Sequence, residues 1–99
     1  MGQYMSTLNE DIDRIGVVVA HINELVGVDR FFDEPYVPRG QWNTISAFGG
    51  PERFTVSVDR REVKQYTDQK LAALVKHRTI MQLRDVLDSV AGTIEKLEE

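Results

Sequence analysis

The chain has 99 residues and no cysteine, which limits it to one domain without disulfide bonds or zinc–thiolate sites. Its apolar fraction of 41% and charged fraction of 28% are typical of a globular protein, and no run of residues is apolar enough to cross a membrane. The net charge of −4 divides into −5 over residues 1–34, +4 over residues 35–78 and −3 over residues 79–99, so opposite charges can pair within one molecule or between copies. No signal peptide is visible, and we expect a single cytoplasmic domain over residues 1–99.

The first predicted element is a helix over residues 7–27, after a flexible N-terminus of residues 1–6. Thr7 is a typical N-cap residue, and Gly27 is suited to end the helix. Between them apolar residues recur at steps of three and four, which is the helical period: Leu8, Ile12, Ile15, Val19, Ile22 and Val26. The valine-rich run 16–22 could instead form a buried strand. These periodic apolar residues, which we call the seam of the helix, continue in phase on both sides of the run. This continuity favours the helix.

Residues 28–41 are predicted to form a loop, because two prolines, Pro35 and Pro38, exclude a continuing helix. Loops of this length in small domains are often functional. The loop carries three aromatic residues, which either plug one end of the core or contact a partner protein: Phe31, Phe32 and Tyr36.

A β-hairpin is predicted over residues 42–58. The alternation of Phe54, Val56 and Val58 with polar residues indicates a strand, and Gly49–Gly50 begins a turn. A two-stranded ribbon is barely stable alone, so it must pack on a helix or pair with another copy. An open edge could also accept a strand from a partner.

Residues 59–98 are predicted to be helical, beginning with an Asp59–Glu62 capping box. The sequence allows one long helix or two. The apolar register shifts near 77–79, and Thr79 with Gln82 resembles a second capping box, so we expect a kink or short break there. The predicted fold class is therefore α+β: helix, aromatic loop, hairpin, then two helices or one kinked helix with coiled-coil-like packing.

The last helix carries the strongest pattern in the chain. Its apolar residues step by 3, 4, 3, 4 and 3, with charges off the seam: Ile80, Leu83, Leu87, Val90, Ile94 and Leu97. The first and last helices could pair within one chain, or either seam could pair with its copy. The narrow stripe of the last helix favours a homo-oligomer, a dimer or larger. We assign to the oligomer interface these six residues and four from the first helix: Ile12, Ile15, Val19 and Ile22.

No catalytic, cofactor or metal site is predicted. His21 and Glu24 share one side of the first helix, but two ligands do not make a metal site. No nucleophile motif, phosphate loop or dinucleotide fingerprint occurs.

The basic middle of the chain indicates an alternative function, the binding of an anion. Arginine binds phosphate or carboxylate with two hydrogen bonds, and tryptophan can stack on a base. The candidate residues for binding an anion or a partner are Arg39, Trp42, Arg53, Arg60, Arg61 and Lys64. These arginines could equally pair with the acidic first helix. The acidic net charge disfavours nucleic acid. The leading hypothesis is a non-enzymatic interaction module that self-associates and binds, scaffolds or inhibits an unidentified partner protein. The second is a binder of a nucleotide or nucleic acid.

Overall fold

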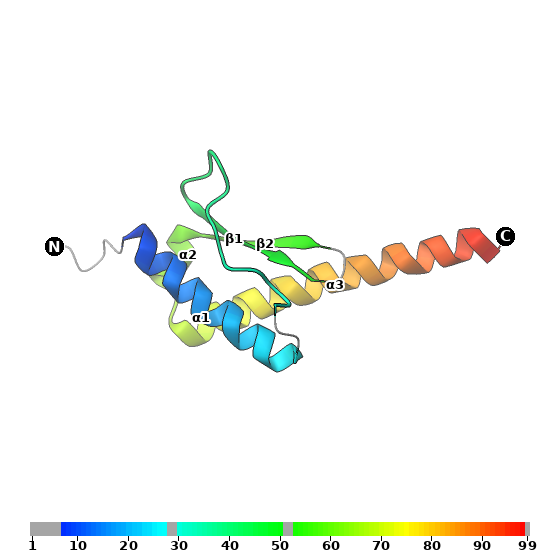
Figure 1. The fold of residues 1–99 in the computed structure, drawn as a ribbon, viewed down its shortest axis with the longest axis horizontal. Coiled ribbons are helices and arrows are strands. Elements are labelled where there is room, and N and C mark those ends of the chain that lie inside the picture. Colours follow the sequence, from blue (N-terminus) through cyan, green and yellow to red (C-terminus); the bar gives the residue numbers. More distant parts are fainter. Residues whose placement is uncertain (1–6, 28–29, 51–52, 99) are drawn as a thin grey trace.

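The computed structural model describes residues 7–27, 30–50 and 53–98, and the predicted flexible N-terminus lies outside these ranges. The elements follow in the order α1 (Leu8–Val26), β1 (Thr44–Gly49), β2 (Phe54–Asp59), α2 (Arg60–Gln65) and α3 (Asp68–Glu98). The fold is α+β, as the sequence predicts: a helix, an antiparallel hairpin and a long C-terminal helix (Figure 1).

Helix α1 begins and ends where the sequence indicates. The hydroxyl of Thr7 accepts a hydrogen bond from the amide of Glu10 at 3.1 Å. Gly27 adopts the left-handed conformation (φ 77°), and its amide donates to the carbonyls of Asn23 and Glu24. Residues 16–22 belong to this helix, so the alternative of a buried strand is wrong.

The hairpin is flanked on one edge by the preceding loop. Strands β1 and β2 pair in register from Thr44 opposite Asp59 to Gly49 opposite Phe54. On the other edge of β1, Phe32 bridges to Gly49 and Tyr36 bridges to Ser46. A side chain at Gly49 would overlap the backbone of Phe31, so glycine is required for this close approach. The loop therefore covers the edge of β1 and leaves no room there for a strand from a partner.

The core lies between the hairpin, α1 and the first half of α3. Val56 and Val58 of β2, together with Ile45 and Ala47 of β1, form the inward face of the sheet. The other buried apolar residues are Ile15, Val18, Val19, Ile22, Phe32, Val63, Leu71 and Val75. This core uses α3 no further than residue 79.

The break between the two C-terminal helices is at Tyr66–Thr67, not near His77–Thr79 as predicted from the sequence. Arg14 of α1 fixes this break: its guanidinium donates to the carbonyls of Val63 and Tyr66 and to Asp68. Through residues 77–79 the helix continues. Thr79 begins no new helix, because its hydroxyl donates to the carbonyl of Val75 at 2.8 Å.

The C-terminal part of α3 extends well beyond the rest of the molecule (Figure 1). The described body measures 64 × 30 × 19 Å, and its long axis runs along this helix. We call residues 80–98 of α3 the arm. The arm contributes no residue to the core, so within a single chain it lacks the packing from which helices in proteins gain most of their stability.

Candidate self-association surface

The predicted seam of α1 packs inside the chain except at its end, where Val26 is 46% exposed. Ile15, Val19 and Ile22 are between 2% and 4% exposed, and Ile12 packs partly buried against the same core. Their side chains have little surface left to offer a second copy. We therefore withdraw α1 from the oligomer interface that the sequence indicated. Of the two arrangements considered for α1, packing within one chain is the one found.

The predicted seam of the last helix is exposed. Five of its six residues are between 43% and 82% exposed, and the sixth, Leu83, is half-buried. We call the six residues the arm seam: Ile80, Leu83, Leu87, Val90, Ile94 and Leu97. Isolated exposed apolar residues are common on proteins, but a continuous row along a projecting helix is a candidate contact surface.

The two borders of the arm seam differ in chemistry. One border carries a cation near its start and an anion near its end: Arg84, Ala91 and Glu98. The other border carries no charge: Thr79, which is buried in the core, Val86 and Thr93. Steps of three and four average 3.5 residues per turn, which is less than the 3.6 of a straight helix. A helix that follows such a seam supercoils left-handedly around its partner.

The predicted arginine site is not assembled as a cluster. Arg60 donates to Asp11 at 2.8 Å, and the side chain of Asp11 is completely enclosed. Arg61 lies beside Asp59, and Arg53 lies over the ring of Phe48, 4.6 Å from its centre. Arg53 and Arg60 flank opposite ends of β2, which places their backbones roughly 20 Å apart. Pairing with acidic residues, the alternative considered from the sequence, accounts for Arg60.

The remaining candidates for anion or partner binding lie on the surface. Arg39 and Trp42 belong to the loop that leads into β1 and stands clear of the body in Figure 1. Trp42 is 71% exposed, and Lys64 on α2 is also exposed. Exposed tryptophan is costly to hydrate and is common at the centres of protein interfaces.

The aromatic residues of the loop divide between core and surface. Phe32 is buried and stacks edge-to-face with Phe31 and Phe54, at ring-centre distances of 5.0 and 6.0 Å. Phe31 is half-buried, whereas Tyr36 is 42% exposed. Of the predicted partner loop, only Tyr36 therefore presents much of its ring to another molecule.

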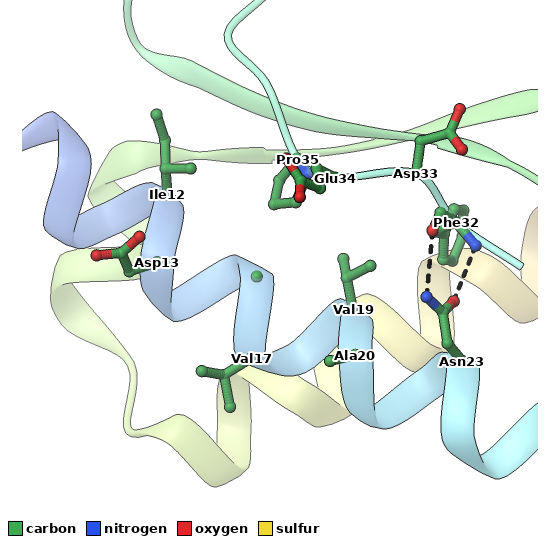
Figure 2. Close-up of a pocket in the computed structure, with 11 residues that line it drawn as sticks. Ile12, Asp13, Val17, Val19, Ala20, Asn23, Phe32, Asp33, Glu34 and Pro35 are labelled. Carbon is green, nitrogen blue, oxygen red and sulfur yellow. Dashed lines mark hydrogen bonds between the residues drawn. The ribbon is translucent and has the colours of Figure 1, made fainter. Parts of the chain in front are cut away.

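A hollow that the sequence did not reveal lies between α1 and residues 32–35 (Figure 2). It is an open groove of about 630 Å³, lined by apolar residues such as Ile12, Val19 and Pro35 and by three acidic residues: Asp13, Asp33 and Glu34. Asn23 holds the loop against the helix by two hydrogen bonds to the backbone of Phe32. A Cβ at position 16 of the helix would lie 3.9 Å from Cγ of Pro35, so the glycine there leaves the hollow open.

Other site chemistry is sparse in the part of the chain that the structure describes. No three histidine, aspartate or glutamate side chains gather there into a possible metal site. None of the helices within those residues has the length and apolar content that crossing a bilayer requires.

Comparison of the chain with protein-family models, with curated proteins and with solved structures gives no match.

Proposed function

We propose that this protein is a non-enzymatic interaction module that self-associates through the arm seam. The observation that carries the proposal is the exposure of Leu87, Ile94 and Leu97 in one continuous row on a helix that extends past the core. A second helix along that row would bury it. A second copy of this chain supplies such a helix, with an arm of equal length and a seam of equal spacing.

The expected strength of this association is moderate. Completing the burial of a half-exposed leucine or isoleucine contributes roughly 1 kcal/mol, so the two arm seams of a pair contribute on the order of 10 kcal/mol. Bringing two chains together costs a comparable amount, about 4–15 kcal/mol. We therefore expect a dimer that forms and dissociates with concentration.

The composition of the arm seam favours two chains over a larger assembly. At its first, third and fifth positions it has Ile80, Leu87 and Ile94, and at the alternate positions Leu83, Val90 and Leu97. These are two apolar residues per heptad, which suits the narrow contact between two helices, whereas a bundle of more helices needs a broader apolar stripe.

In this proposal the rest of the body contacts the partner protein. The loop of residues 37–43, which includes the exposed Trp42, projects from the body away from the tip of the arm, so pairing of the arms leaves it accessible (Figure 1). Two separate surfaces would let the dimer present two copies of one binding loop to a partner, which increases avidity. The nucleotide or nucleic-acid alternative has less support, because Arg60 is already occupied by Asp11.

The test is the molar mass of the full chain by light scattering and sedimentation over a wide concentration range. We expect a monomer–dimer equilibrium, and Leu87→Asp should shift it to monomer by placing a charge in the seam. Ser89→Asp is the matched control, because Ser89 lies on the same helix off the seam and should leave the dimer intact. A monomer at every concentration, or equal effects of both variants, would overturn the proposal.

A further inference from the structure

The spacing of the arm seam is the same from either end. Its steps of 3, 4, 3, 4 and 3 form a palindrome, so a second arm running in the opposite direction meets every seam residue with a seam residue. Full overlap in that direction places Ile80 beside the partner's Leu97, Leu83 beside the partner's Ile94, and Leu87 beside the partner's Val90.

The sizes of these residues match in that direction. Each antiparallel layer joins one β-branched residue to one leucine, so all layers have similar volume. Parallel pairing would instead place like beside like, with small Val90 beside Val90 and large Leu87 beside Leu87. Packing is best when large and small side chains alternate across an interface, since this fills space without cavities or overlap.

The charged border of the arm seam also favours opposite directions. In antiparallel helices the border that carries Arg84 and Glu98 faces the same border of the partner, whereas in parallel helices it faces the border of Thr79 and Thr93. Antiparallel overlap therefore brings Arg84 of each chain towards the partner's Glu98, twice per dimer. Parallel pairing offers no opposite charges across either border.

We infer that the occupant of the arm seam is the arm of a second copy of this chain, bound antiparallel with Ile80 beside the partner's Leu97. This inference depends on the proposed self-association and adds its direction and register. The two bodies then lie at opposite ends of a shared two-helix rod, with their Trp42 loops facing separate regions of solvent.

The absence of cysteine permits a direct test by disulfide cross-linking. Ile80→Cys and Leu97→Cys are prepared separately in the full chain, one of them labelled with ¹⁵N. Each is oxidised alone and in an equal mixture, and cross-linked peptides are mapped by mass spectrometry. In the antiparallel dimer the two copies of position 80 stand about 25 Å apart, given 1.5 Å per residue of helix, so each variant alone should stay reduced. In the mixture the mixed dimers, about half of all dimers by random pairing, should form the 80–97 disulfide.

The possible outcomes test the direction in which the arms pair separately from self-association itself. Efficient 80–80 and 97–97 disulfides in the separate samples would overturn the antiparallel direction and leave self-association standing. A dimer by sedimentation that forms no cross-link in any sample would overturn this register. A monomer in all samples at high concentration would overturn the proposed function and this inference together.

A charge exchange gives a second readout without cysteine. Arg84→Glu should weaken the dimer roughly three- to tenfold, and adding Glu98→Arg should restore most of that loss. Asp85→Lys with Lys96→Asp, two substitutions away from the seam borders, is the matched control and should show no such coupling. An Arg84→Glu, Glu98→Arg double variant no tighter than the single variant would contradict the antiparallel pairing.

Discussion

The guanidinium of Arg60, the first residue of α2, donates a 2.8 Å hydrogen bond to Asp11 on α1, whose side chain is completely enclosed by protein. The two residues are far apart in the sequence, and their ion pair joins the first helix to the end of the hairpin. A charged group away from water is tolerated only when it is paired, so the position of Asp11 depends on Arg60.

Removing one partner of this ion pair should therefore lower the stability of the fold. Asp11→Ala leaves the buried part of the guanidinium without its carboxylate, and we expect the free energy of unfolding to fall by about 3 kcal/mol. Chemical denaturation of the full chain measures this change. Asp13→Ala is the control on the same helix, because Asp13 is exposed, and it should change stability by less than about 0.5 kcal/mol. Equal losses from the two variants would show that the ion pair is not responsible.

A second ion pair predicts how stability depends on pH. Arg78 binds both carboxylate oxygens of Glu62, at 3.0 and 2.8 Å, and these hydrogen bonds hold the pKa of Glu62 below its ordinary value. A carboxyl group whose pKa is lowered by folding stabilises the fold above its unfolded-state pKa, and this contribution disappears as the pH falls through the folded-state pKa.

We therefore compare Glu62→Gln with the unmodified chain by urea denaturation between pH 7 and pH 3. Above about pH 5, where glutamate is ionised in the unfolded chain, the unmodified chain should be the more stable. The difference should shrink as the pH falls through the acidic range. A difference that stays constant with pH would contradict the role of the Glu62 charge. Asp59 also has a lowered pKa and is present in both chains, so its own titration contributes to both stability curves.

The sequence predicts most local features of this fold, because local chemistry determines them. The Thr7 and Asp59 caps, the Gly27 terminus and the strand of Phe54, Val56 and Val58 are all confirmed. The prediction of a helix break near Thr79 is wrong, and the reason is physical. Arg14 on α1 fixes the actual break through hydrogen bonds to residues about fifty positions away, which no local pattern contains.

The two helical seams look alike in the sequence but have different environments. The α1 seam is covered by the hairpin and by Leu71 and Val75 of α3, whereas the arm seam extends beyond the reach of the hairpin. Periodicity shows that a face is apolar, but it does not show what covers that face. The separation of Arg53 from Arg60 follows from the predicted strand between them, whereas the pairing of Arg60 with Asp11 of α1 is a long-range contact that no local pattern contains.

The hollow beside α1 gives a test of the geometry at Gly16. A Cβ at this position would make ordinary contact with Pro35, and glycine inside a helix costs about 1 kcal/mol relative to alanine. Gly16→Ala should therefore raise the free energy of unfolding by about 0.5–1 kcal/mol. Gly27→Ala is the opposite control. Gly27 has a positive φ, so its substitution should lower the free energy of unfolding. Destabilisation by Gly16→Ala would show that the loop lies closer to α1 than 3.9 Å implies.

The arm contains one glycine, Gly92, on the side of the helix away from the seam, and a Cβ there would meet no neighbouring atom. A helix without packing frays, so part of the cost of self-association is the cost of forming the arm helix. Gly92→Ala lowers that cost by about 1 kcal/mol per chain, and the dimer should tighten at least about fivefold in sedimentation experiments.

In the Leu87→Asp background the same substitution should raise helicity by circular dichroism and leave the protein monomeric. Weaker association of Gly92→Ala would mean that the partner contacts the face of Gly92, and the assignment of the arm seam would then be wrong.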